Sequence, residues 1–118
     1  MKPRFIHASD AGISVRNDEH GGCGPIRFSR LLTSSSFESR VDFVDHTILP
    51  AGSTIGRHRH IGNEEFYFVA RGSPIIRVDD EEIRAVRGTV AIVRSGQSHE
   101  LINDTDEEVE ILVVQIPL

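Results

Sequence analysis

Cysteine is almost absent from this sequence of 118 residues, which contains only Cys23. One cysteine excludes a disulfide within the chain and a metal site built from several thiolates. No apolar run approaches the length of a membrane span, and the first residues, MKPRFIHASDAG, lack the apolar core of a signal peptide. We therefore expect a soluble cytoplasmic protein that makes no contact with a membrane.

Basic residues are also fewer than acidic residues. The 13 Lys and Arg residues are outnumbered by 18 Asp and Glu residues, which gives a formal net charge of -5. This balance argues against a surface that binds nucleic acid or an anionic membrane. The length is that of one domain. The partner that we expect is a small molecule, with no nucleic acid and no membrane involved.

Helical periodicity is missing as well, which argues against βαβ units. From Val41 onward the chain instead alternates short β-branched or aromatic segments with turn residues. The predicted strands cover residues 41–49, 53–61, 65–71, 75–79, 82–86, 89–94, 98–103 and 109–116. Short strands with turn signals at such regular spacing predict an all-β fold, either a sandwich or a barrel.

Residues 1–40 show no clear pattern. Within them, 17–24 (NDEHGGCG) is predicted to be a loop, 26–32 a short strand and 33–39 a polar connection. We treat 1–40 as an N-terminal arm and 41–118 as the barrel domain. Because small barrels leave sheet edges exposed, we expect a homodimer, in which the arm could exchange a strand with the partner.

Histidine is the residue left to bind a metal, and two of the six histidines are well placed for it. His58 and His60 lie two apart in a predicted strand, so their side chains point to the same face. The next strand begins near Glu64 and Glu65, which have opposite parity, so only one of them can share that face. His99, on a later strand, is a candidate from a distant segment.

The residues around the first histidine pair resemble a known motif. Gly52, His58, His60, Glu65 and Gly72 follow the spacing G-x5-H-x-H-x4-E-x6-G, the first motif of the cupin family. This spacing selects Glu65 over its neighbour. Each glycine lies where a strand reverses or bends, and a Cβ would be in the way there.

The second cupin motif, G-x5-P-x-G-x2-H-x3-N, resembles the segment that contains Gly88, Gly96, His99 and Asn103. It departs at one position, because Arg94 replaces the proline. The departure concerns the stiffness of a turn and leaves every candidate ligand in place. Fifteen residues separate the two motifs, which is about the shortest spacer of the family.

The resemblance implies a double-stranded β-helix, or jelly-roll, barrel that holds one divalent metal ion. Its ligands would be His58, His60, Glu65 and His99. Nitrogen and oxygen donors suit manganese, iron, nickel, cobalt or zinc, and the sequence does not choose among them. Open positions on the ion would take a small carboxylated or polyhydroxylated substrate. A decarboxylase, dioxygenase, isomerase or cyclase is our first hypothesis, and a non-catalytic binding or sensing cupin is the alternative.

Three further residues are candidates for supporting roles. Tyr67 shares the face of Glu65 and could act as a catalytic acid or hydrogen-bond donor, or could be an aromatic of the barrel wall. Asn103 could support His99 or only shape its strand. Arg77 could anchor an anionic substrate if it points inward, or could be solvated. The histidines outside both motifs are not expected to be ligands: His7, His20 and His46.

Overall fold

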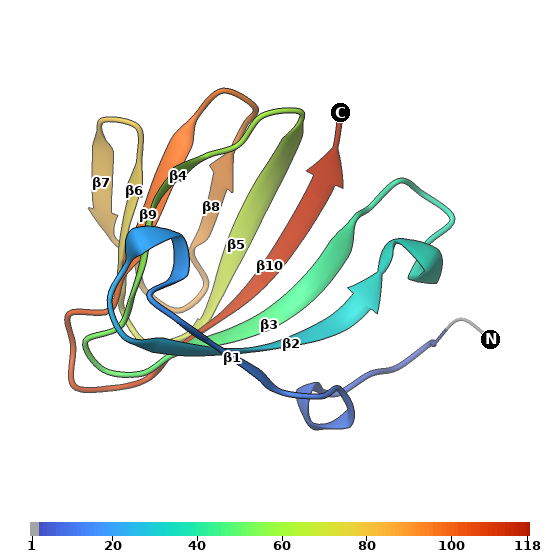
Figure 1. Cartoon of the computed structure of the whole chain (residues 1–118), viewed down its shortest axis with the longest axis horizontal. Coiled ribbons are helices and arrows are strands. Elements are labelled where there is room, and N and C mark those ends of the chain that lie inside the picture. The colour runs from blue at the N-terminus through green and yellow to red at the C-terminus, as the bar shows by residue number, and fades with distance from the viewer. Residues whose placement is uncertain (1–2) are drawn as a thin grey trace.

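The computed structural model describes residues 3–118, and strands dominate it (Figure 1). The strands from residue 41 onward are β3 (Phe43–Leu49), β4 (Thr54–Arg59), β5 (Asn63–Arg71), β6 (Ile75–Val78), β7 (Glu81–Arg84), β8 (Val90–Val93), β9 (Ser98–Ile102) and β10 (Val109–Pro117). All eight strands predicted for this part of the chain are present, which confirms the all-β fold. None of the helical segments among the described residues is long and apolar enough to cross a lipid bilayer.

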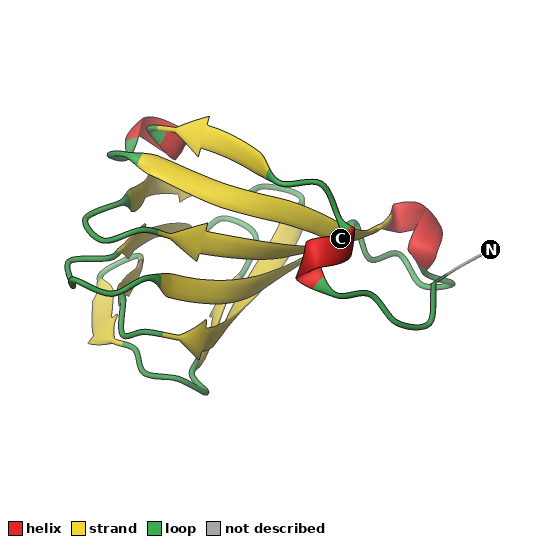
Figure 2. Cartoon of the chain, turned by 90° about the horizontal axis from the view of Figure 1, so that it is seen from below, coloured by secondary structure: helices red, strands yellow, loops and turns green. Residues whose placement is uncertain are grey.

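Two antiparallel sheets form the barrel. One begins with two N-terminal strands, β1 (Ser14–Asn17) and β2 (Pro25–Thr33), and has the order β1-β2-β3-β10-β5-β8. The other has the order β4-β9-β6-β7. Figure 2 shows strands joined by loops, with short helical turns beside them. The core lies between the sheets, where alternate residues of β10, Val109, Ile111 and Val113, are buried. The same alternation in β5 buries Glu65, Tyr67 and Val69.

Part of the predicted N-terminal arm, residues 14–17 and 25–33, belongs to the larger sheet. β1 (Ser14–Asn17) pairs with β2 (Pro25–Thr33), and β2 pairs with β3 of the same chain. β2 was predicted, although one residue shorter at each end. β1 was missed because all four of its residues are exposed, so the strand carries no apolar alternation. Strand exchange between two copies, and the homodimer itself, stay predictions.

Three short 3-10 turns were also not predicted: η1 (Ala8–Asp10), η2 (Glu19–Gly21) and η3 (Ser34–Ser36). The second one matters for the site, because it packs tightly on β4. A Cβ at Gly56 would overlap the carbonyl oxygen of His20, and a Cβ at Gly22 would overlap that of Thr54. Two glycines therefore allow the segment of residues 18–24, which we call the η2 loop, to lie directly against β4.

Candidate metal centre

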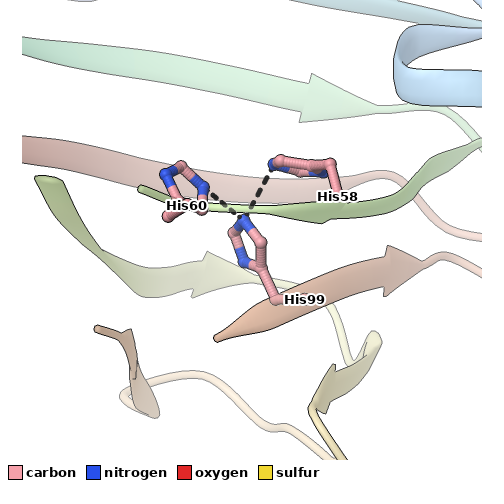
Figure 3. Close-up of side chains that lie close together, drawn as sticks. All are labelled: His58, His60 and His99. Carbon is pink, nitrogen blue, oxygen red and sulfur yellow. Dashed lines mark hydrogen bonds between the residues drawn. The ribbon is translucent and has the colours of Figure 1, made fainter. Parts of the chain in front are cut away.

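Three histidine side chains converge between the sheets (Figure 3). His58 and His60 come from the β4 side and His99 comes from β9, where the register places it opposite His58. The Nε2 atom of His99 lies 2.9 Å from Nε2 of His58 and 2.9 Å from Nε2 of His60. The three ligand atoms all lie within 4.8 Å of one another. The structure therefore brings the histidines of the two motifs to one point.

The outer nitrogens of two of these rings fix their protonation. Nδ1 of His58 donates to the carbonyl oxygen of Gly56 over 2.8 Å, and Nδ1 of His60 donates to Oδ1 of Asn63 over 2.7 Å. Since neither oxygen carries a hydrogen, each Nδ1 must carry the proton of a neutral ring. Both Nε2 atoms therefore direct a lone pair toward His99, which is the arrangement of metal-ligating histidines.

The His99 ring cannot by itself form hydrogen bonds with all the groups around it. Its Nε2 atom is within hydrogen-bond distance of three groups, the two histidines and the Tyr67 hydroxyl at 3.1 Å. One ring nitrogen carries at most one proton, and its Nδ1 atom is buried without a partner. A cation at the centre would satisfy all three lone pairs. Ligand nitrogens about 2.1 Å from such an ion lie about 3 Å apart at right angles, and the two distances from His99 to His58 and His60 are close to this value.

Burial keeps the rings of His58 and His99 neutral. It lowers the pKa of His99 to about 2, with a further contribution from the neighbouring His58 and His60. Burial also lowers the pKa of His58. Only neutral imidazole ligates a metal, so both rings are ready to do so at neutral pH.

Glu65 lies beside the three histidines. Its Oε1 atom is 3.7 Å from Nε2 of both His60 and His99, and its side chain is buried. Burial raises the pKa of the carboxyl, while His60 and a hydrogen bond with Tyr67 oppose the rise. Burial, together with the neighbouring Glu65, raises the pKa of Tyr67 well above its usual value, so the phenol keeps its proton. The alternation of β5 directs both side chains to the cluster.

A cavity of about 370 Å³ opens beside the histidines, between the two sheets. Its walls include the candidate ligands His58, His60 and Glu65, and also Tyr67. The cavity contains residues that the motifs do not cover, above all His20, Arg16 and Arg30. No periodic pattern in the sequence marks these positions. The glycines after His20 are the one local signal that this segment lies close to another part of the chain.

Two of the supporting candidates lie away from the cluster. Asn103 is fully buried, and its side-chain amide donates to the carbonyl oxygens of Leu49, Pro50 and Glu107. It therefore joins two turns, in line with the strand-shaping alternative. Arg77 pairs with Glu82 and Glu100 on the surface and does not line the cavity.

Arg94 stands where the second motif has proline, and the turn that it begins is held by hydrogen bonds. The Arg94 amide donates to the side chain of Gln97 over 2.9 Å, and the Gln97 amide donates back to the Arg94 carbonyl over 3.0 Å. These two bonds close the turn without proline. His60 is tied to the same turn, because its carbonyl oxygen accepts from the Gly96 amide.

Similar proteins agree with this fold. An oxalate-binding protein of Thermotoga maritima is 29% identical over 116 residues, which cover 91% of this chain and 96% of that protein. A crystal structure from Thermotoga maritima, described as a predicted oxalate decarboxylase, superposes with a TM-score of 0.92 at 25% identity, covering 97% and 99% of the two chains. KdgF from Halomonas sp. shares the fold, with a TM-score of 0.76 at 12% identity, covering 98% and 94%.

Tetracenomycin polyketide synthase protein TcmJ of Streptomyces glaucescens is 33% identical over 73 residues. The matched segment covers 62% of this chain and 49% of that protein, so this chain corresponds to about half of it. Residues 45–115, which contain all four candidate ligands, match the family described as the cupin domain, and the chain therefore belongs to the cupin family.

Proposed function

We propose that this chain is a metal-dependent cupin that binds a small carboxylate at one divalent ion held by His58, His60, Glu65 and His99. The observation that carries the proposal is the convergence of three imidazole nitrogens on one point. Two of them have lone pairs fixed by outer hydrogen bonds. Without a cation this buried arrangement leaves donors and acceptors unmatched.

Oxalate is the first ligand to test. A relative that aligns over nearly the whole chain is described as an oxalate-binding protein. The cavity beside the histidines has room for a small molecule. A bound divalent ion would supply the positive charge that carboxylate oxygens need, as a Lewis acid.

A second candidate function is turnover of the carboxylate, and the position of Tyr67 favours it. Its hydroxyl is buried, keeps its proton, and lies 3.1 Å from Nε2 of His99. Decarboxylation of oxalate breaks the C–C bond, releases CO₂ and requires one proton on the remaining carbon to give formate. Tyr67 is the group of this chain that could deliver that proton beside the cluster.

Metal-stripped protein, reloaded separately with Mn²⁺, Fe²⁺, Ni²⁺, Co²⁺ and Zn²⁺, provides the test. We expect about one ion per chain by elemental analysis, and binding of oxalate by calorimetry only after loading. His58→Gln and His99→Gln should lose the metal, whereas His7→Gln, an exposed histidine outside the cavity, should keep it. Retention of metal by both site variants, with native circular dichroism, would exclude the proposed site.

The same loaded protein decides between binding and turnover. Formation of formate and CO₂ from oxalate would support the enzyme, and Tyr67→Phe should then abolish formate without weakening oxalate binding by more than a few fold. Tight binding with no product under any metal would favour the non-catalytic alternative.

A further inference from the structure

Two guanidinium groups face the cavity from strands that lie outside the segment matched to the family. Arg16 is on β1 and Arg30 on β2, and both line the cavity that contains the histidine cluster. Each lies over an aromatic ring: Arg16 over Phe28 and Arg30 over Phe43, both with 4.1 Å from Cζ to the ring centroid. Such stacking holds a guanidinium in a fixed plane.

Arg30 is the more firmly held of the two. Its Nε atom donates to Oδ1 of Asp45 over 2.9 Å, and its Nη2 atom donates to Oδ2 over 3.0 Å. Asp45 is a buried carboxylate, whereas the Arg30 side chain is 42% exposed. A guanidinium has five N–H groups, so the bidentate pair leaves the rest free for another acceptor. Arg30 is a positioned donor at the cavity wall.

The charges around the cavity favour an anionic ligand once a metal is bound. Its walls carry three guanidinium groups, Arg16, Arg30 and Arg59, and three carboxyl groups, Glu19, Asp45 and Glu65. The charges of these six groups sum to zero when all six are ionised. A divalent ion at the histidines would then give the cavity two positive charges in excess, which a dianion neutralises.

The cavity is also large for oxalate, whose two carboxylates are bonded directly to each other. About 370 Å³ falls within the range of pockets that hold larger organic ligands. A ligand with carbon atoms between its carboxylates would fill more of this volume. Arg30 and Asp45 line this cavity together with His58, His60 and Glu65, so the pair and the cluster share one space.

We infer that Arg30, positioned by Asp45 and Phe43, binds the second carboxylate of an aliphatic dicarboxylate longer than oxalate. The first carboxylate would bind at the metal proposed above, so this inference depends on the proposed function. The cupin motifs would supply the metal ligands, and the N-terminal strands would supply the specificity. This assigns Arg30 the anchoring role considered for Arg77.

Calorimetry on the metal-loaded protein with acetate, oxalate, malonate and succinate tests the inference. We expect malonate or succinate to bind at least about tenfold more tightly than acetate and more tightly than oxalate. In Arg30→Lys this preference should disappear, because an ammonium cannot engage Asp45 and the ligand through one planar fork. Binding of the metal and of acetate should stay as in the wild type.

Arg84→Lys is the matched control. Arg84 forms a bidentate pair with Asp104 as Arg30 does with Asp45, but it does not line the cavity. We expect its ligand preferences to be those of the wild type. Should Arg30→Lys fail to fold, the double variant Arg30→Met/Asp45→Leu removes both charges together and leaves no unpaired ion in the interior. It should also lose the preference for dicarboxylates.

The outcomes separate the two proposals. If acetate or oxalate binds only to loaded protein, but longer dicarboxylates gain nothing or Arg30→Lys keeps their advantage, the inference on Arg30 is wrong and the metal site stands. If the protein holds no metal at the histidines, both proposals fail together.

Discussion

The imidazole of His20 lies parallel to that of His58, with ring centroids 3.7 Å apart and 13° between the planes. His20 belongs to the η2 loop, far from both motifs in sequence, and has left-handed backbone angles of φ 53° and ψ 34°. Such angles are uncommon for a residue with a Cβ and cluster at functional positions. A segment outside the motifs therefore covers one face of a candidate metal ligand.

This stacking predicts how substitutions of His20 act on metal binding. His20→Ala should weaken metal affinity by about 2- to 10-fold, since an aromatic pair contributes about 0.5–1.5 kcal/mol. His20→Phe keeps a flat ring over His58 and should retain most of the affinity. Competition with a chelator of known affinity measures both. Equal losses in the two variants would mean that His20 acts through its nitrogens and not through stacking.

The adjacent residues Glu64 and Glu65 offer a matched pair of substitutions. Glu65→Gln keeps the size of a buried side chain 3.7 Å from two histidine nitrogens and removes its charge. We expect metal affinity to fall by about tenfold or more, equal to about 1.4 kcal/mol. Glu64→Gln makes the same change on the opposite parity of β5 and should have no effect. A loss in the Glu64 variant alone would mean that the register of β5 differs from the one described.

The choice between these two glutamates shows what the sequence could predict. Strand alternation and motif spacing are local patterns, and they were sufficient for the eight strands after residue 41 and for the inward-facing side chain of Glu65. The meeting of His58 and His60 with the distant His99 was expected only from the resemblance to the cupin motifs. Asn103 was also a candidate from the sequence, but the carbonyl groups that it joins come from two turns that are distant in the chain. Those contacts depend on how the turns pack.

Local sequence patterns could not predict the N-terminal part of the site. β1 is exposed on both faces, so no periodicity marks it. Arg30 meets Asp45 through the pairing of β2 with β3, and His20 meets His58 because two glycines let the η2 loop approach β4. These are tertiary contacts between residues that are distant in sequence. Arg77 was a candidate for an anchor if its strand register pointed it inward, whereas two of the arginines that line the cavity, Arg16 and Arg30, come from β1 and β2.

The lowered pKa of His99 predicts acid sensitivity of the metal-free protein. In the unfolded chain an imidazole takes up its proton near pH 6.5, whereas in the folded protein the pKa of His99 is about 2. Between these values the unfolded state binds more protons, so the free energy of unfolding falls as the pH falls below about 6.5. The slope from one such histidine is about 1.4 kcal/mol per pH unit.

Urea unfolding of metal-free protein between pH 7.5 and 5.5 measures this slope above the titration range of most carboxylates. His99→Gln should reduce the slope by the contribution of one proton, and His7→Gln should leave it unchanged. A slope that is the same in wild type and His99→Gln would contradict a neutral, buried His99. The sign is opposite to that of a histidine stabilised by an acidic partner, whose contribution is lost as the pH rises.

Gly56 links the η2 loop to the metal site, and its substitution separates the loop from the barrel. A Cβ at this position would overlap the carbonyl oxygen of His20, so Gly56→Ala must displace the loop and with it the ring that covers His58. Metal affinity should fall to the level of His20→Ala. Because both changes remove the same contact, the double variant should bind metal no more weakly than either single one.

Gly12→Ala, where a Cβ meets nothing within 4 Å, is the control and should match the wild type. Additive losses in the double variant would show that Gly56 acts on β4 and His58 directly, and that the η2 loop does not hold the metal ligand in place.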